Sequence, residues 1–315
     1  MKKLRAAVVG VGYLGNFHAQ KFKNNPHCEL VAVCDANPVQ AQKIATDLGV
    51  AAYSNPKDLV GKVDLVTIAT STRFHFEVAS LFVNEGIAVN VEKPMTATLE
   101  QAEKLYEICE KRKSFLTVGH VERFNPSLVE LNQKIAMEAN HFEFTRWTPF
   151  RMRGSDVSVV FDLMVHDLDM MFWLTQGGNV KNHSVRGDIA VSQEPDTVNA
   201  YFDLSLGSKN KSVYMSISRA SGKALRQVKV YSPNKTIVAN TGTHEFEMYE
   251  YFPSAPKEEE KIKTSAWTVN KVDALQEETN HFIDCVLNNK KPQITAEDGL
   301  QAMIWADKID KQIRK

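Results

Sequence analysis

The sequence predicts an α/β fold in two parts: a doubly wound parallel sheet, followed by a domain with a large, mostly antiparallel open sheet. Three observations predict it. Short apolar runs alternate with helical segments from Leu4 to about Gly119, a glycine-rich turn joins the first run to the first helix, and strand patterns follow one another from about Phe142. Alternating strands and helices form parallel sheets, whereas successive strands separated by turns form antiparallel ones.

The first part carries an alternation of apolar runs and amphipathic segments. The helical segments place apolar residues at intervals of three and four, which is the period of a helix with one buried face. We place the domain boundary at 120/121. The expected strands span 4–9, 30–34, 65–69, 87–91 and 115–118, and the expected helices span 13–23, 38–48, 73–85 and 99–113.

The pattern of apolar and polar residues changes in the second part, 121–315. Turn signals such as Gly207-Ser208 and Pro233-Asn234 separate short runs that alternate apolar and polar residues. We expect two helices at the C-terminal end. The last of these helices can pack back on the first domain. The expected strands span 142–147, 180–191, 197–205, 212–218, 228–231, 236–239 and 245–251, and the expected helices span 161–174, 273–287 and 295–313.

Composition excludes several classes of protein. Lys+Arg and Asp+Glu both number 38 in 315 residues, so the chain lacks the basic excess of a nucleic-acid binder. No apolar stretch approaches the ~20 residues that span a bilayer. Four scattered cysteines without C-x-x-C spacing are typical of reduced thiols in a cytoplasmic protein. The charged run 257–263 reads as a solvated turn or edge.

The turn Gly10-Val11-Gly12-Tyr13-Leu14-Gly15 is the most informative motif. A strand, a glycine-rich turn and a helix in that order present backbone N–H groups to a pyrophosphate, as in the Rossmann fold of dinucleotide-binding proteins. Asp35 ends the next strand, twenty positions after Gly15, where a carboxylate accepts the ribose hydroxyls. Its charge opposes a 2′-phosphate, so NAD is favoured over NADP, although Lys43 in the next helix leaves NADP open.

Polar residues follow three later strands of the expected parallel sheet, at the edge where ligands bind. Ala69, Thr70 and Ser71, with His75, suit a backbone that passes close to the cofactor. Glu92-Lys93-Pro94 follows the next strand. His120, Arg123 and Asn125 follow the last one, and we expect them to contribute to substrate binding.

Lys93 is a candidate catalytic residue. Pro94 fixes the backbone as the chain leaves the sheet and favours an extended conformation at Lys93. A lysine near a positively charged nicotinamide has a lowered pKa, and it can relay a proton or polarise a carbonyl oxygen. An ordinary surface lysine after a strand is the alternative.

Asp162 and His166 stand four residues apart in an expected helix, and therefore on one face. Asp162 can orient the imidazole, and His166 can accept a hydroxyl proton as hydride leaves the adjacent carbon. Asp169 lies near that face and could hold a sugar hydroxyl. The alternatives are acids that cap the helix and, more weakly, a metal site without a fourth ligand; we predict no metal.

Arg151 and Arg153 lie just before this helix. Two forked cations there suit a diphosphate or a carboxylate on the substrate. Surface charge on a loop explains them equally well.

Together these motifs resemble the Gfo/Idh/MocA family of sugar and cyclitol oxidoreductases. The matching residues are Gly10–Gly15, Asp35, Ala69-Thr70 with His75, Glu92-Lys93-Pro94, and Asp162 with His166. The resemblance spans essentially the whole chain and implies NAD as cofactor, an active site lined by Lys93, Asp162 and His166, and cofactor contacts from Glu92. It also implies a homodimer or homotetramer formed through the second sheet.

The segments around His120 and Asp162 look most like the branch that contains bacterial UDP-N-acetylglucosamine 3-dehydrogenases. That resemblance implies oxidation of the 3-hydroxyl of the nucleotide sugar, in the route to the diamino sugar of lipid A. Val159-Val160-Phe161 depart from the glycine pair that many members carry before the aspartate. The alternatives are a dehydrogenase or reductase of an inositol, a free sugar or a bilin-type pigment, and a non-catalytic sensor that binds NAD.

Overall fold

The computed structural model describes residues 3–134, 138–152, 154–155 and 157–314. The chain divides into two compact units. Unit 1 consists of Met1–Val121 with Asp273–Ile304, and unit 2 consists of Glu122–Val272 with Trp305–Lys315. The chain thus leaves the first unit at residue 121 and returns to it at residue 273.

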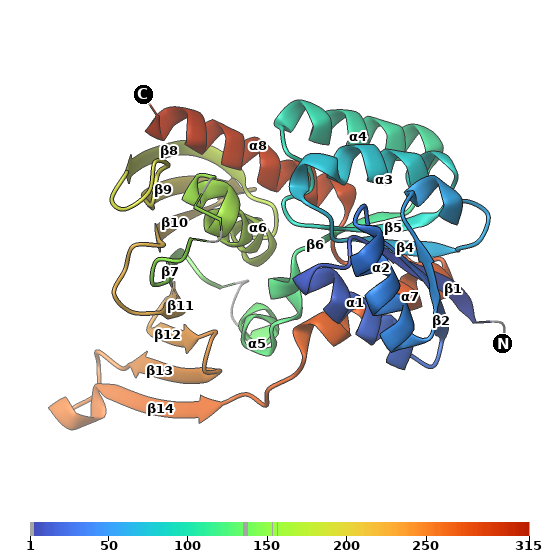
Figure 1. Ribbon diagram of the computed structural model, residues 1–315. Coiled ribbons are helices and arrows are strands. Elements are labelled where there is room, and N and C mark those ends of the chain that lie inside the picture. Colours follow the sequence, from blue (N-terminus) through green and yellow to red (C-terminus); the bar gives the residue numbers. More distant parts are fainter. Residues whose placement is uncertain (1–2, 135–137, 153, 156, 315) are drawn as a thin grey trace. The chain divides into compact units, whose positions relative to one another are not determined.

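Unit 1 contains a sheet of six parallel strands in the order β3-β2-β1-β4-β5-β6 (Figure 1). The order reverses between β1 and β4, as in doubly wound folds. Apart from β3 at the sheet edge, the strands are largely buried, which fits their continuous apolar runs. They are β1 Leu4–Val9, β2 Cys28–Cys34, β3 Ala51–Tyr53, β4 Leu65–Ile68, β5 Ala88–Glu92 and β6 Leu116–Gly119.

Helices connect these strands, and local signals in the sequence set their ends. Asn37 caps α2 by accepting from the N–H groups of Val39 and Gln40, and Gly49 ends that helix at a φ of 65°. Thr98 caps α4 through the N–H of Gln101. The connecting helices are α1 Tyr13–Asn24, α2 Pro38–Leu48, α3 His75–Asn84 and α4 Leu99–Arg112, with the short 3-10 turns η1 Pro56–Leu59 and η2 Thr72–Phe74. A third 3-10 turn, η3 Val121–Phe124, lies where the chain passes into unit 2. After unit 2 come α7 Ala274–Asn288, in unit 1, and α8 Ala296–Ile313, whose residues from Trp305 onward belong to unit 2.

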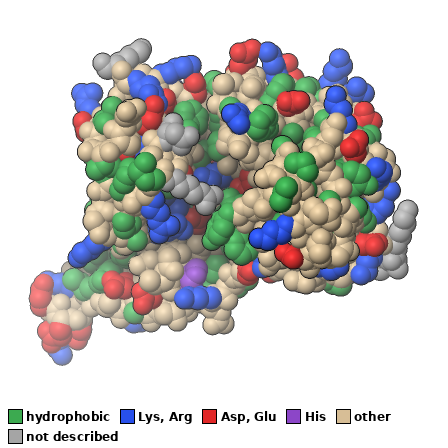
Figure 2. Space-filling model, in the orientation of Figure 1, with side chains coloured by type: hydrophobic (Ala, Val, Ile, Leu, Met, Phe, Trp, Pro, Cys, Tyr) green, Lys and Arg blue, Asp and Glu red, His purple; other side chains and the backbone are tan. Residues whose placement is uncertain are grey.

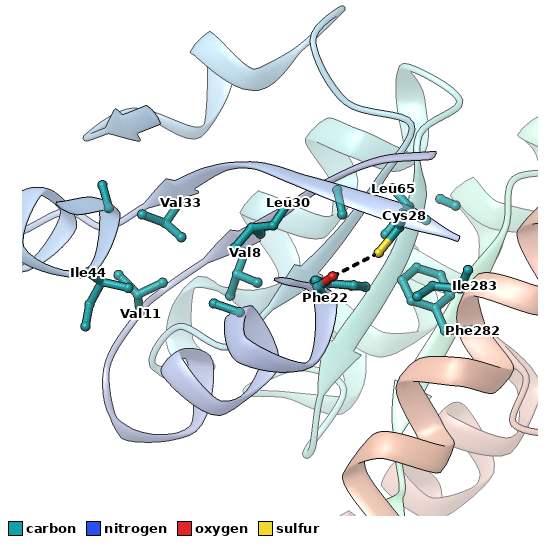
Figure 3. Close-up of a cluster of buried hydrophobic side chains, with 14 residues drawn as sticks. Val8, Val11, Phe22, Cys28, Leu30, Val33, Ile44, Leu65, Phe282 and Ile283 are labelled. Carbon is teal, nitrogen blue, oxygen red and sulfur yellow. Dashed lines mark hydrogen bonds between the residues drawn. The ribbon is translucent and has the colours of Figure 1, made fainter. Parts of the chain in front are cut away.

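The core of unit 1 forms where α1, α2 and α7 cover one face of the sheet (Figure 3). Val8 and Leu65 project from the strands toward Phe22 of α1 and Phe282 of α7. The rings of Phe22 and Phe282 lie 6.4 Å apart. Each side chain of this size contributes about 1.5–3 kcal/mol when it leaves water.

All four cysteines of the chain are buried free thiols in unit 1. Cys28 donates its S–H to the carbonyl of Phe22, as Figure 3 shows. Burial raises the pKa of Cys28 to about 11 and that of Cys34 and Cys109 to about 12. These thiols therefore stay protonated and unreactive near neutral pH.

Unit 2 contains an eight-stranded sheet in the order β14-β13-β12-β11-β7-β10-β9-β8. Neighbouring strands are antiparallel except β7 and β10, which pair in parallel. The strands are β7 His141–Trp147, β8 Asn179–Asp188, β9 Thr197–Leu206, β10 Lys209–Ser218, β11 Leu225–Ser232, β12 Lys235–Asn240, β13 Glu245–Tyr251 and β14 Ile262–Thr268, and the helical segments are α5 Pro126–Lys134, a π-turn η4 Val160–Met164, α6 Val165–Leu174 and the 3-10 turn η5 Glu258–Glu260.

Alternate residues of the second sheet point to opposite faces. On β9, Val198, Ala200, Phe202 and Leu204 are buried, and the ring of Phe202 lies 5.7 Å from that of Trp305 in α8. The other face carries Tyr201 and other polar residues. One face of this sheet is therefore packed and the other is polar.

The fold class predicted from the sequence is confirmed: a parallel Rossmann sheet precedes a mostly antiparallel open sheet. Several elements were not predicted, namely β3, α5 and β14. The run 257–263 forms η5 and the start of β14 at the end of a hairpin, where Figure 2 shows charged side chains gathered. In the described part of the chain, no helix has both the length and the apolar character needed to cross a bilayer.

Gly15 has the tightest surroundings of any glycine in the fold. A Cβ at this position would lie 1.7 Å from the carbonyl oxygen of Gly10, whereas a Cβ at Gly12 would meet nothing within 4 Å. Gly15→Ala should therefore push α1 away from β1 and lower the free energy of unfolding by about 1–3 kcal/mol or more. Urea denaturation measures this. Gly12→Ala is the matched control, and equal stability of the two variants would contradict the packing argument.

Candidate active site

The glycine-rich turn lies against the end of β4. A Cβ at Gly10, which has a φ of 84°, would lie 2.6 Å from the backbone nitrogen of Thr70 and 2.7 Å from the carbonyl of Ala69. Gly12 is the N-cap residue of α1, and the space beside its Cα is unoccupied. The first N–H groups of a helix have no partners within it, so this open turn fits an anionic group.

Asp35 is held in place at the end of β2. Its Oδ2 accepts from the N–H of Val11 and its Oδ1 from the N–H of Asn37, both at 2.9 Å. Gln40 donates to the carbonyl of Val11 and so fixes the same turn. The carboxylate and the glycine-rich turn therefore form one rigid unit. Tyr13 and Leu14, the other predicted cofactor contacts of this turn, are exposed.

His75 bridges two strand ends. Its Nδ1 lies 2.9 Å from the carbonyl oxygen of Pro94, and its Nε2 lies 3.1 Å from that of Thr70. Burial lowers the pKa of His75, and the two carbonyls oppose this shift because they favour the protonated ring. His75 is almost fully buried. In unit 1 it ties the turn after Lys93 to the backbone at Ala69–Ser71, and direct contact with a cofactor stays a prediction.

Glu92 and Lys93 leave the end of β5 together. Lys93 is half-buried, and its backbone N–H donates to Glu92 Oε2 at 3.1 Å. Glu92 Oε1 lies 2.8 Å from Nε2 of the buried His18. His18 lowers the pKa of Glu92 against the opposing effect of burial, and Glu92 raises that of His18.

His18 and its neighbour Glu278 were missed by reasoning from the sequence. Glu278, on α7, accepts from the amide of Asn90 at 3.0 Å, and both side chains are buried. A signal was available: Asn90 interrupts a buried apolar strand, where a polar side chain requires a partner. The partner lies 188 residues further along the chain, and local patterns give no information about such a distance.

In unit 2, η4 and α6 carry Asp162 and His166. Asp162 lies in the π-turn and His166 in the first turn of α6, and both are partly exposed. The expected single helix over 161–174 is thus widened at its start, so the two residues are not separated by a regular α-helical turn. The backbone at Gly154 passes close to Asp162, since a Cβ there would lie 3.2 Å from Oδ2.

Arg123 and Asp169, predicted to bind substrate, pair with each other. The guanidinium contacts both carboxylate oxygens, at 2.6 Å from Nη2 and 3.0 Å from Nε, and both residues are buried. The carboxylate of Asp169 thus already accepts charge-assisted hydrogen bonds from two nitrogens of the guanidinium. The pair attaches η3 to α6, and a direct contact of either residue with substrate stays a prediction.

A second buried arginine attaches α6 to the sheet. Arg146 of β7 contacts Asp167 Oδ2 at 2.6 Å and Glu122 Oε1 at 2.9 Å. Arg146 lowers the pKa of Glu122 despite its burial, whereas burial dominates at Asp167 and raises its pKa. Asn125 completes this cluster: it donates to Glu122 and to the carbonyl of Thr241, and accepts from Ser127.

The remaining predicted residues are dispersed. His120 is buried in unit 1, after β6. Arg151 is exposed in the loop after β7, and Arg153 lies outside the described residues. Buried Arg219 holds this loop by donating to the carbonyls of Gly154 and Val157, each at 2.6 Å. Within the described ranges, no group of three or more His, Cys, Asp or Glu residues could hold a metal ion.

The comparisons with known proteins agree with this fold and these motifs. The profile of an oxidoreductase family with an NAD-binding Rossmann fold, GFO_IDH_MocA, matches residues 4–120. The rhizopine catabolism protein MocA of Rhizobium meliloti is 30% identical over 226 residues, which cover 66% of this chain and 70% of that protein. The chain belongs to the Gfo/Idh/MocA family of oxidoreductases.

A UDP-N-acetylglucosamine 3-dehydrogenase matches over more of the chain. The protein from Acidithiobacillus ferrooxidans is 29% identical over 286 residues, or 91% of this chain and 90% of the relative. Its solved structure matches with a TM-score of 0.90 and 27% identity, covering 99% of this chain and 98% of that one. The predicted class, an NAD(P)-dependent dehydrogenase, is confirmed.

The Arg123–Asp169 pair provides a test of the packing around α6. Arg123→Met should leave a buried carboxylate without its cation and cost about 3–5 kcal/mol of unfolding free energy. Chemical denaturation measures the loss. Arg5→Met, which removes the only partly buried pair with Asp64, should cost much less. A similar loss in both variants would show that the buried pair does not fix α6.

Proposed function

We propose that the protein oxidises the 3-hydroxyl of UDP-N-acetylglucosamine with NAD. The observation that supports this proposal most strongly is the extent of the likeness to a UDP-N-acetylglucosamine 3-dehydrogenase. The likeness includes both units, with a TM-score of 0.90. Inositol dehydrogenases are also relatives, but they match only about half of the chain. They support a second candidate, oxidation of an inositol. The 3-keto product of the first reaction would suit an amination that yields a diamino sugar.

The residues of unit 1 fit an NAD molecule. The open backbone at Gly12 and the N–H groups of Tyr13, Leu14 and Gly15 would hold the pyrophosphate, and Asp35 would accept the ribose hydroxyls. The fixed carboxylate opposes a 2′-phosphate, which favours NAD over NADP. We assign residues 1–120 to cofactor binding and 121–315 to substrate binding and oligomerisation, with the segment 273–304 packed on unit 1.

When bound, NAD would supply the acceptor for the hydride that leaves the carbinol carbon. His166 takes the hydroxyl proton as the hydride leaves, and Asp162 orients the imidazole. Lys93 stabilises the negative charge that develops on the oxygen as the carbonyl forms. Arg151 and Arg153 bind the diphosphate of the nucleotide sugar. Substrate binding is the role that we propose for His120, Arg123, Asn125 and Asp169.

We also propose a cytoplasmic homodimer or homotetramer. The polar face of β8, β9 and β10 carries the half-exposed Tyr201 and Tyr214 beside a hollow of about 650 Å³. Tyrosines that combine an apolar ring with a polar tip are enriched at such interfaces. Four buried, reduced thiols support a reducing compartment.

The reduced nicotinamide absorbance measures the proposed reaction directly. With NAD, turnover of UDP-N-acetylglucosamine should exceed that of free N-acetylglucosamine, myo-inositol and scyllo-inositol, and NADP should support less turnover than NAD. Faster oxidation of an inositol would replace the nucleotide sugar with the second candidate. The product ketone is identified by mass spectrometry after borodeuteride reduction.

Lys93→Met should lower kcat by about 10²–10⁴-fold, because the variant keeps the bulk of the stem and loses the charge that stabilises the developing oxyanion. NAD affinity, measured by calorimetry, should change little, since the cofactor is held mainly by the glycine-rich turn and Asp35. Exposed Lys104 supplies the control Lys104→Met. Near-normal turnover of Lys93→Met would remove Lys93 from the mechanism.

A further inference from the structure

We propose that a buried network of His18, Asn90, Glu92 and Glu278 positions Lys93 for hydride transfer, and that Glu278 must be protonated for it to do so. The inference deepens the proposed function, because the role of Lys93 rests on it. The network itself is defined by contacts within unit 1. None of its four members is a residue to which we assign chemistry on the substrate.

The sheet register gathers these groups on one face. Asn90 and Glu92 are two positions apart on β5, so their side chains point to the same side. Thr67 and Thr117 pair with Asn90 from the neighbouring strands and continue a polar row across the sheet. This is the face that α1 and α7 cover, as the core contacts of Phe22 and Phe282 show. His18 and Glu278 come from these two helices.

Glu92 connects the network to Lys93. One carboxylate oxygen contacts His18 at 2.8 Å, and the other accepts from the Lys93 backbone N–H at 3.1 Å. Gly119 faces Glu92 across the pair with β6, and a Cβ there would lie 3.2 Å from Oε2. The carboxylate is thus confined on three sides. The position of the Glu92 carboxylate therefore fixes the backbone of Lys93, from which the lysine side chain extends.

Glu278 has a different partner set from Glu92. It is 3% exposed and contacts the neutral amide of Asn90, while the imidazole of His18 contacts Glu92. Within the described residues, Glu278 Oε2 and Asn90 Oδ1 are buried atoms without a hydrogen-bond partner. The amide oxygen can only accept, so it needs a donor. A protonated Glu278 supplies one, and an ionised Glu278 does not.

The charge balance points the same way. The charged groups that face Glu278 are His18 from α1 and Glu92 from β5. Burial raises the pKa of Glu278 to about 7; His18 and the amide of Asn90 oppose this shift, and the charge of Glu92 assists it. With Glu278 neutral, Glu92 contacts His18 without a second negative charge beside it. Above pH 7 a second negative charge competes for His18 and weakens its hold on Glu92.

The pH dependence of turnover tests this. In the wild type, kcat should fall as Glu278 loses its proton, with a midpoint near pH 7. Glu278→Gln keeps the carbonyl that accepts from Asn90 and cannot ionise, so this fall should disappear. His18→Gln should lower kcat more than it raises KM for NAD, because it releases Glu92 and not the cofactor. Glu100→Gln, at an exposed site on α4, should reproduce the wild-type profile.

A measurement without substrate separates this proposal from the proposed function. The folded state holds the Glu278 proton more tightly than the unfolded state, whose glutamate titrates near pH 4.5. The stability that Glu278 contributes should therefore fall as pH rises from about 4.5 to 7. The raised pKa of His18 adds stability below about pH 6.5 that is lost at higher pH, in the same direction. The fall in Tm should be shallower in Glu278→Gln than in the wild type and Glu100→Gln.

The outcomes are distinct. An unchanged stability slope in Glu278→Gln would overturn the proposal whatever the substrate proves to be. Failure of all tested sugars and inositols would instead overturn the proposed function and leave the stability result standing. If Glu278→Gln does not fold, infrared spectroscopy of the wild type decides: a buried protonated carboxyl band should be lost between pH 6 and 8. Its absence at pH 6 would overturn the proposal.

Discussion

The close approach of α1 to β1 is the constraint on which unit 1 depends. Gly15 lies so near the carbonyl of Gly10 that only a hydrogen fits between them. This contact fixes where α1 begins and holds its first N–H groups at the edge of the sheet. It also fixes the next turn of the helix, where His18 meets Glu92. One glycine therefore controls both the glycine-rich turn and the contact of His18 with Glu92 beside Lys93, because a rigid helix joins them.

Unit 2 achieves similar precision with buried charges. Asp167 and Asp169 lie two residues apart on α6 and pair with arginines from β7 and η3. Two bidentate contacts in different directions fix both the height and the rotation of a helix. His166, on the same helix, therefore has a fixed backbone position. Such pairs contribute little net stability but specify one arrangement, because breaking either leaves a buried charge.

The sequence contained most of the fold because its signals are local. Apolar runs predicted five strands of unit 1, and Asn37, Gly49 and Thr98 mark helix ends by their own chemistry. β14 was missed because its residues are largely polar at a sheet edge, and β3 because three residues carry no period. The contacts within the candidate site were predicted from the sequence less completely than the fold. The sequence shows that Arg123 and Asp169 are polar, but not that they satisfy each other, and His18 carries no local sign of its partner on β5.

The distribution of thiols has a practical consequence. All four cysteines lie in unit 1, buried and protonated, and the sequence places none in 122–272. An alkylating reagent can reach each of them only when the part of unit 1 that buries it opens. The rate of alkylation therefore measures how often unit 1 opens, without a contribution from unit 2. Mass spectrometry of the four modified peptides would give a separate rate for the segment around each cysteine. No cysteine has to be introduced, and the second sheet gives no signal.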